Sequence, residues 1–152
     1  MKTVLFVCTG NTCRSPMAEA IARGAVSDGR IGLASQENLE IFSAGLHAVD
    51  GAPLSHEAAE LLHERGLECS GRSVRLTAEM AREADLVLGM TSAHVAGIRG
   101  LLDGDAVAIA HVHPLDPSGD IPDPIGQGPE VYEQTANRIG QLLPTRLEEL
   151  LK

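Results

Sequence analysis

Aromatic residues are scarce in this 152-residue chain, which has no Trp, 1 Tyr and 2 Phe. A pocket for an aromatic ring usually has aromatic walls, so the sequence offers little material for one. Lys and Arg are also in deficit, at 12 against 21 Asp and Glu, which leaves a net charge of -9. This balance argues against nucleic acid or an anionic membrane as a partner.

Long apolar runs and paired cysteines are missing as well. No stretch reaches the length of a membrane span, and the first residues enter a predicted strand without a signal-peptide cleavage pattern. The 3 cysteines are an odd number, which fits a reducing compartment better than a disulfide framework, and the absence of a Cys-x-x-Cys pair argues against a zinc site. His111 and His113 fit solvated loop side chains better than a metal pair. We predict a cytoplasmic monomer without metal or cofactor.

Apolar runs alternate with amphipathic segments along the chain. Strands are expected at 4–7, 39–43, 84–90 and 106–110. Helices are expected at about 16–26, 55–66, 77–81, 91–101 and 130–151, the last with a kink or break at Pro144. The alternation predicts a single α/β domain over residues 1–152, with a four-stranded parallel sheet, doubly wound with helices on both faces.

The segment from Cys8 to Ser15 joins the first predicted strand to the first predicted helix, whose start we place at Ser15 and Pro16. Backbone N–H groups and the positive end of the helix dipole make such a junction an anion site. A cysteine in this position is favoured as a thiolate and can act as a nucleophile. Cys8 is the candidate nucleophile, in a phosphate-binding loop after the first strand.

Arg14 lies at the other end of this loop. Its planar guanidinium can hold two phosphate oxygens at once, which a lysine could not do. Ser15 is placed to hydrogen-bond the Cys8 sulfur, while Gly10 and Asn11 tolerate the left-handed backbone that turns successive N–H groups inward. The combination indicates phosphoryl transfer to sulfur.

The run Cys-Thr-Gly-Asn-Thr-Cys-Arg-Ser at 8–15 resembles the phosphate-binding loop of the low-molecular-weight protein tyrosine phosphatase family. Further motifs follow in the family's order over nearly the whole chain: Phe-Ser-Ala-Gly at 42–45, Ala-Asp-Leu-Val-Leu-Gly-Met-Thr at 84–91, Asp-Pro at 123–124 and Tyr-Glu-Gln-Thr at 132–135. The resemblance implies a phosphatase of phosphorylated proteins with a phosphocysteine intermediate. It also implies that the substrate is bound by Thr9, Gly10, Asn11, Thr12, Cys13 and Ser15.

The reaction needs a general acid for the leaving group and later a base that activates water. Two Asp-Pro pairs compete for this role, Asp116-Pro117 and Asp123-Pro124. Composition does not choose between them, because either Asp could be a turn former before Pro. The family pattern, with Asp-Pro shortly before a final helix that contains Tyr, implies Asp123.

Ser43 and Tyr132 are supporting candidates. In the family a Ser of the second-strand motif hydrogen-bonds the loop Asn, so the resemblance implies that Ser43 braces Asn11. The alternative is an ordinary serine at a strand end. Tyr132 either lines the pocket or packs the start of the last helix, and the sequence favours neither.

The family includes phosphotyrosine enzymes and others that resemble a protein arginine phosphatase. Thr12 stands where tyrosine-directed members usually carry Ile or another apolar residue, and its hydroxyl suits a polar phosphoramidate. Ile125 and Gly126 follow the Asp-Pro pair where tyrosine-directed members tend to have aromatics, although we would expect Phe at 125 in an arginine-type enzyme. We expect phosphoarginine as the substrate, with phosphotyrosine as the alternative.

Two rival functions and one redox hypothesis remain. Thioredoxin-coupled arsenate reductase has a very similar loop, but it needs two more cysteines after the third strand, and residues 88–94 contain none. A non-catalytic phosphoprotein-binding module would have no need for Cys8. A reversible Cys8–Cys13 disulfide would protect Cys8 from irreversible oxidation; the alternative is that Cys13 is a small buried thiol under the loop.

Overall fold

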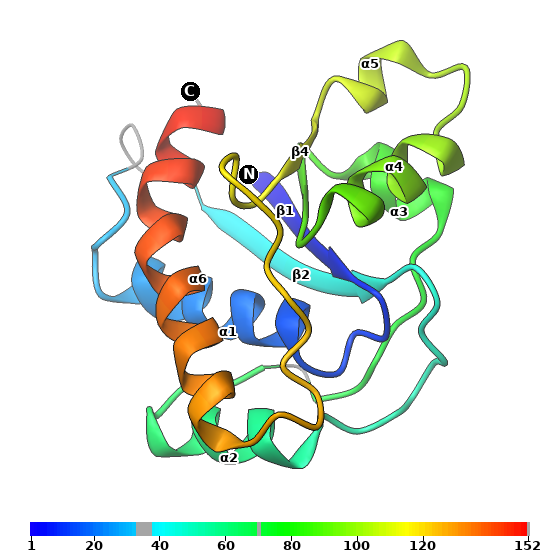
Figure 1. The fold of residues 1–152 in the computed structure, drawn as a ribbon. Helices are drawn as coiled ribbons and strands as arrows, with labels where there is room; N and C mark the ends of the chain where they lie inside the picture. Colours follow the sequence, from blue (N-terminus) through cyan, green and yellow to red (C-terminus); the bar gives the residue numbers. More distant parts are fainter. Residues whose placement is uncertain (33–37, 70, 152) are drawn as a thin grey trace.

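The computed structural model describes residues 1–32, 38–69 and 71–151. Its centre is a four-stranded, all-parallel sheet with the strand order β2-β1-β3-β4 (Figure 1). The strands are β1 (Lys2–Cys8), β2 (Leu39–Gly45), β3 (Leu86–Gly89) and β4 (Val112–Pro114). The predicted fold class is confirmed.

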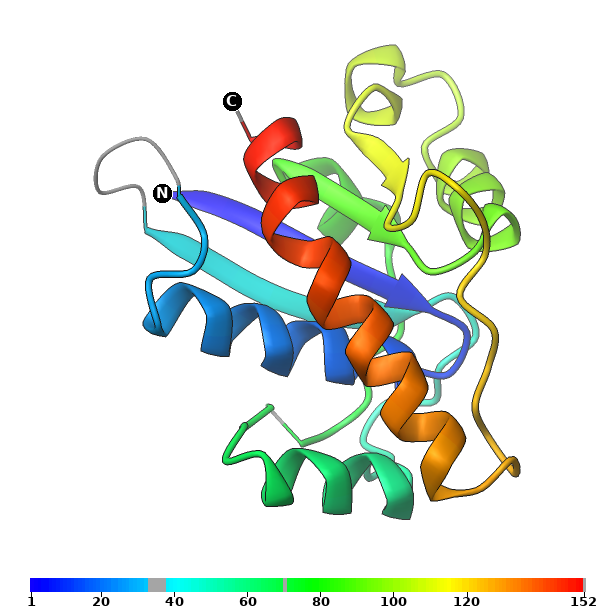
Figure 2. The ribbon, with the colours of Figure 1, turned by 60° about the vertical axis from the view of Figure 1, so that its left-hand side comes forward.

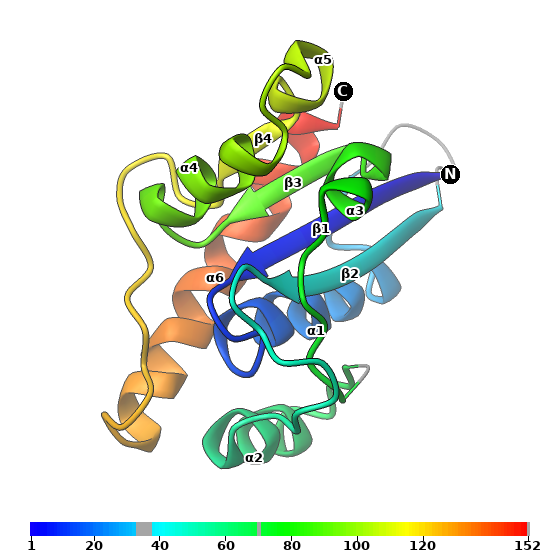
Figure 3. The same ribbon diagram turned by 90° about the vertical axis from the view of Figure 1, so that its right-hand side faces the viewer.

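Helices cover both faces of this sheet. The helices α1 (Arg14–Ser27) and α6 (Pro129–Leu150) lie on one face, and α2 (His56–Glu64) packs against both of them (Figure 2). The helices α3 (Ala78–Glu83) and α4 (Ser92–Leu101) lie on the other face (Figure 3). A short helix, α5 (Ala106–Ile109), precedes β4.

Strand β1 lies between β2 and β3, and its two faces are buried under the helices on the two sides of the sheet. Val4 and Phe6 belong to the core under α1 and α6, whereas Leu5 and Val7 belong to the core under α3 and α4. A strand covered on both faces is apolar at successive positions, which explains the unbroken run in the sequence. Each buried side chain contributes about 2 kcal/mol, so the strand that ends at Cys8 is firmly fixed.

One predicted strand is wrong. Residues 106–109 form α5, and the fourth strand begins only at Val112. Asp105 caps α5 by accepting a hydrogen bond from the Ala108 N–H at 3.0 Å, and alanine favours helix over strand. An apolar run this short does not distinguish a strand from a helical turn by its periodicity.

The five predicted helices are all present, as α1, α2, α3, α4 and α6. Helix α6 is not broken at Pro144, because buried Leu143 and Leu147 on either side of it keep this part of the helix packed on the core. Three helices have side-chain caps at the expected positions, Ser55, Thr77 and Thr91.

Candidate active site

The carboxyl ends of the parallel strands meet at one edge of the sheet, and two loops come together there (Figures 1 and 3). The Cys8 loop (residues 8–15) runs from the end of β1 into α1, and the Asp123 loop (residues 120–128) precedes α6. Because β1 is flanked by β2 on one side and β3 on the other, the Cys8 loop opens into the crevice where such sheets bind ligands.

Cys8 and Ser15 are in contact, as predicted. The Cys8 Sγ lies 2.9 Å from the Ser15 Oγ, and both residues are buried. The Ser15 hydroxyl also lies 3.3 Å from the carbonyl oxygen of Ala44, so the contact with sulfur is the shorter of the two. When Cys8 is a thiolate, Ser15 can donate its proton to the sulfur and stabilise the negative charge.

The helix start predicted at Ser15 and Pro16 is two positions too late. Helix α1 begins at Arg14, its N-cap is Cys13, and no side chain caps it. The Ser15 hydroxyl is not free to cap, because it contacts Cys8 and accepts a hydrogen bond from the Asn11 Nδ2 at 2.9 Å. No capping side chain therefore occupies the N–H groups at the start of α1.

Asn11 holds the turn of the Cys8 loop. It has a positive φ of 54°, and its Oδ1 accepts a hydrogen bond from the Val74 N–H at 2.8 Å. The predicted Ser43–Asn11 brace is wrong, because Ser43 donates instead to the Glu19 Oε1 at 2.7 Å. Ser43 pairs with Phe6 in the β1–β2 register, which places it under α1 rather than beside the loop.

Gly45 lets β2 approach the Cys8 loop closely. A Cβ there would lie 2.5 Å from the Thr9 carbonyl oxygen and 2.8 Å from the Asn11 nitrogen, and both of these are backbone atoms. The loop carbonyls of Cys8 and Thr9 accept hydrogen bonds from residues 46 and 47, and that of Thr12 accepts one from Ser55, each at 2.9 Å.

The N–H groups of the Cys8 loop are left for a ligand. Within 1–32, 38–69 and 71–151, no protein group accepts a hydrogen bond from the N–H groups of residues 9–13. The Arg14 Nε is also buried and without a protein partner in these ranges. Buried donors normally have partners, so this group of donors fits a bound oxyanion beside the Cys8 sulfur.

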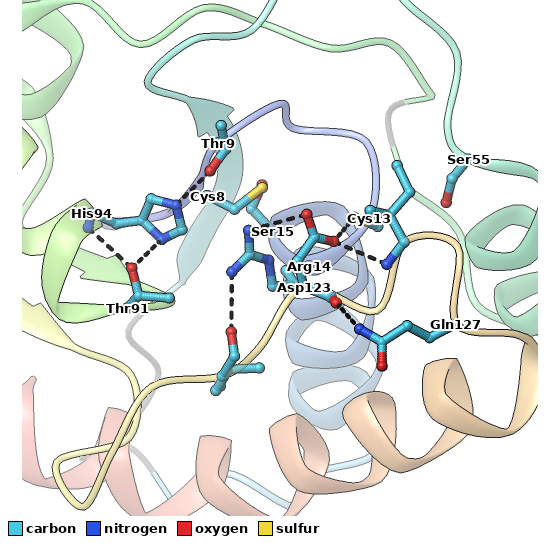
Figure 4. Close-up of polar contacts among 12 residues, drawn as sticks. Cys8, Thr9, Cys13, Arg14, Ser15, Ser55, Thr91, His94, Asp123 and Gln127 are labelled. Atoms are coloured by element: carbon cyan, nitrogen blue, oxygen red, sulfur yellow. Dashed lines mark hydrogen bonds and ion pairs between the residues drawn. The ribbon is translucent and has the colours of Figure 1, made fainter.

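Arg14 also connects the two loops. Its Nη1 donates to the Ile121 carbonyl oxygen at 3.0 Å, and its Nη2 lies 3.7 Å from the Asp123 Oδ2 (Figure 4). Asp123 Oδ1 in turn accepts a hydrogen bond from the Ile125 N–H at 3.1 Å, and Gln127 Nε2 donates to the Asp123 carbonyl oxygen at 2.9 Å. The Asp123 side chain remains 43% exposed and faces the Cys8 loop.

Asp116, the competing acid, is held elsewhere. Its Oδ2 accepts hydrogen bonds from the Nε and Nη2 of Arg138 at 3.2 and 2.8 Å. The hydrogen bond with Arg138 lowers the pKa of Asp116, which keeps it a carboxylate. Of the two Asp-Pro pairs, only Asp123 is thus brought to Arg14.

Cys13 and Tyr132 are both buried beside the site. Burial, with the nearby Cys8 and Asp123 charges, raises the pKa of Cys13 to about 12, and its Sγ lies 3.5 Å from the Asp123 Oδ1. Cys13 therefore remains a thiol and donates its S–H to the Asp123 Oδ1. Tyr132 is 1% exposed and donates to the Ser55 Oγ at 3.3 Å, which favours packing at the start of α6 over pocket lining.

His94 is part of the site and was missed by the sequence reasoning. Its Nε2 lies 2.8 Å from the Thr9 Oγ1 and its Nδ1 lies 3.0 Å from the Thr91 Oγ1 (Figure 4). Burial, and then the Arg14 charge, lowers the pKa of His94 to about 4. The available signal was the spacing Thr91-x-x-His94, in which the third residue after a helix cap faces back towards it.

The described ranges contain no group of three or more His, Cys, Asp or Glu side chains that could hold a metal ion. Among the helices of the same ranges, none is long and apolar enough to cross a membrane.

Comparison with known proteins identifies the family. A family model described as low molecular weight phosphotyrosine protein phosphatase matches residues 3–152. A protein-arginine-phosphatase of Bacillus subtilis is 36% identical over 151 residues, covering 98% of this chain and 97% of the relative. A low molecular weight protein-tyrosine-phosphatase, PtpB, of Staphylococcus epidermidis is 34% identical over 140 residues, covering 92% and 93%.

Solved structures agree with this assignment. A YwlE mutant from Bacillus subtilis superposes with a TM-score of 0.84 at 31% identity, covering 100% of both chains. A YwlE arginine phosphatase mutant with a phosphorylated active-site serine gives a TM-score of 0.84 at 32% identity, covering 99% of this chain and 96% of that one. The chain therefore belongs to the low-molecular-weight protein tyrosine phosphatase family and is a protein phosphatase.

Proposed function

We propose that this phosphatase hydrolyses phosphoarginine in proteins through a phosphocysteine intermediate on Cys8. The observation that carries the proposal is the Thr12 hydroxyl, which is half-buried in the Cys8 loop next to Gly10 and has no protein hydrogen-bond partner among the described residues. A polar group in this position is available to a phosphoramidate, whose bridging nitrogen and guanidinium are both polar.

The first half-reaction transfers the phosphoryl group to sulfur. The loop N–H groups and the Arg14 Nε hold the phosphate oxygens, and the Cys8 thiolate attacks phosphorus. The bond from phosphorus to the arginine nitrogen breaks as Asp123 donates its proton to that nitrogen. Arginine leaves, and the enzyme carries phosphocysteine.

The second half-reaction restores the enzyme. Asp123, now a carboxylate, takes a proton from a water molecule, whose oxygen attacks the phosphocysteine. The bond from sulfur to phosphorus breaks, phosphate leaves, and Ser15 stabilises the released Cys8 thiolate across the 2.9 Å contact. Asp123 is protonated again for the next cycle.

The positions of the aromatic residues support this choice of substrate. Phe6 and Tyr132 are buried. Phe42 lines a groove with Thr3 and Met80, and no residue of the Cys8 loop lines this groove. None of them forms a wall for a phenyl ring. One observation favours phosphotyrosine instead: Ile125, beside Asp123, is 58% exposed and offers an apolar surface.

Measuring kcat/KM for a phosphoarginine peptide and the matching phosphotyrosine peptide tests the proposal. We expect the wild type to prefer phosphoarginine and Thr12→Ile to shift the ratio towards phosphotyrosine. Cys8→Ser, which should lose activity on both peptides, controls for contaminating phosphatases. A clear wild-type preference for phosphotyrosine would refute the phosphoarginine proposal and leave the phosphatase assignment intact.

We also propose that residues 1–152 act as a single cytoplasmic domain and a monomer. The odd number of cysteines, 3, supports a reducing compartment. A reversible Cys8–Cys13 disulfide is part of this proposal, and peroxide inactivation that dithiothreitol cannot reverse would count against it.

A further inference from the structure

The first turn of α4 lies between the two loops of the site. On one side, the Ser92 N–H donates to the Asp120 Oδ1 at 2.8 Å, and the Ile121 N–H donates to the Met90 carbonyl oxygen at 2.9 Å. These bonds fix the start of the Asp123 loop. On the other side, the His94 side chain reaches the Cys8 loop.

The hydrogen bonds of the His94 ring indicate where its proton lies. The Thr91 Oγ1 accepts a hydrogen bond from the backbone N–H of His94 at 3.1 Å and lies 3.0 Å from Nδ1. Thr91 can then donate its own hydroxyl proton to Nδ1, which leaves the ring proton on Nε2. The Nε2 atom faces the Thr9 Oγ1, 2.8 Å away (Figure 4), so a proton on Nε2 would be donated to the Thr9 hydroxyl.

Thr9 directly follows the nucleophile and is held from two sides. Its carbonyl oxygen accepts a hydrogen bond from the His47 N–H at 2.9 Å, and its hydroxyl oxygen lies 2.8 Å from the His94 Nε2. His94 is 6% exposed, while Thr9 itself is exposed at the mouth of the site. Among the described residues, the Thr9 side chain makes its one hydrogen bond with this buried ring.

We propose that His94 is a positioning residue, whose Nε2–H holds the Thr9 hydroxyl and thereby keeps the first peptide groups after Cys8 in their anion-binding arrangement. The inference rests on the proposed role of the Cys8 loop. Because the ring is neutral near pH 7, Arg14 remains the cation of the site, and the ring acts through hydrogen bonds alone.

Two isosteric variants separate this role from plain packing. The amide nitrogen of Gln can reach the place of Nε2, whereas Asn reaches only the place of Nδ1 and keeps the contact with Thr91. With para-nitrophenyl phosphate, we expect His94→Asn and His94→Ala to lower kcat/KM by roughly 10-fold to 100-fold, since small shifts of a binding loop have effects of this size. His94→Gln should stay within about 3-fold of wild type.

The inhibition constant for inorganic phosphate gives a second readout that needs no chemical step. It should rise with His94→Asn and recover with His94→Gln. Thr9→Val removes the hydroxyl from the surface side, so it should cost about as much as His94→Asn and add little in the double variant. His111→Ala, at an exposed histidine outside the site, is the matched control.

Equal kcat/KM and phosphate inhibition for wild type, His94→Asn and Thr9→Val would overturn the inference. So would a His94→Gln variant as impaired as His94→Asn, because the recovered hydrogen bond would then have no effect. If the buried variants fail to fold, Thr9→Val alone decides. Cys8→Ser distinguishes failure of the proposed function from failure of this inference. Turnover at the wild-type rate in Cys8→Ser would refute the proposed function, whereas the His94 variants can refute only the positioning role.

Discussion

The Cys8 loop and the Asp123 loop meet at one edge of the sheet but are built in opposite ways. In the Cys8 loop, the side chains that carry chemistry are buried, with Cys8 at 1%, Arg14 at 5% and Ser15 at 0% exposure. In the Asp123 loop, the Asp123 and Ile125 side chains are exposed. The Cys8 loop is held by contacts to β2, α1 and α4, whereas the Asp123 loop is held at Asp120, Ile121 and Asp123.

In the proposed mechanism the two loops recognise different parts of the substrate, and the difference between them matches this. The phosphate group is the same in every substrate, so its binding loop can be formed in advance and held by β2, α1 and α4. The leaving group and the surrounding protein vary, and they meet the Asp123 loop. There Gly126 and Gly128, with φ of 73° and 91°, allow a backbone that other residues would resist.

The largest expected effect is that of replacing Asp123, the proposed general acid. Asp123→Asn should lower kcat by roughly 100-fold to 1,000-fold for a substrate with a poor leaving group, because proton donation is lost. An aryl phosphate with an activated leaving group should be affected much less. Steady-state kinetics on both substrates measure the difference.

Asp116→Asn is the matched control for this prediction, since it alters the other Asp-Pro pair. Arg138 holds Asp116 away from the Cys8 loop, so turnover should remain within about 2-fold of wild type. Equal losses in the two variants would show that Asp123 is not the acid.

A smaller effect is expected where β2 approaches the Cys8 loop. Gly45→Ala places a Cβ 2.5 Å from the Thr9 carbonyl oxygen, so the backbone must shift. We expect the free energy of unfolding to fall by about 2 to 3 kcal/mol and the affinity for phosphate to decrease. Gly100→Ala, in the open on α4, should be neutral or stabilising by less than about 1 kcal/mol. Denaturant unfolding compares them, and similar results for both would contradict a closely fitted Cys8 loop.

The smallest effect concerns the pH dependence of stability. Burial lowers the pKa of His94 from 6.5 to about 4, so between these values the unfolded chain binds the extra proton. The stability that the neutral ring provides is complete above pH 6.5 and is lost as the pH falls towards 4. In His94→Gln, this contribution to the fall in stability between pH 6.5 and 4 should be absent. Parallel curves for the two proteins would mean that the ring is less buried than the structure shows.

The sequence predicted what depends on neighbouring residues. Cys8, Arg14 and Ser15 lie within one strand-to-helix junction, so spacing alone indicated their chemistry and the contact between sulfur and hydroxyl. The apolar runs likewise predicted the parallel sheet, apart from the segment 106–110, which was too short for its periodicity to be decisive.

Contacts between distant segments were not predictable in this way. The β1–β2 register places Ser43 beside Glu19, and the amide of Asn11 is held by Ser15 and Val74 instead. His94 belongs to the site only because α4 begins next to the Cys8 loop. Such pairings depend on how strands and helices are aligned in space, which one sequence does not specify.

Trapping the phosphoenzyme tests the central claim most directly. The wild-type protein would be mixed with excess substrate and quenched in denaturant within one turnover, and its mass and modified peptide would be determined by mass spectrometry. We predict a protein heavier by one phosphoryl group, with the phosphate on Cys8, and no such species for Cys8→Ala. Turnover without a phosphorylated Cys8, or phosphate on another residue in the wild type, would contradict the proposed mechanism.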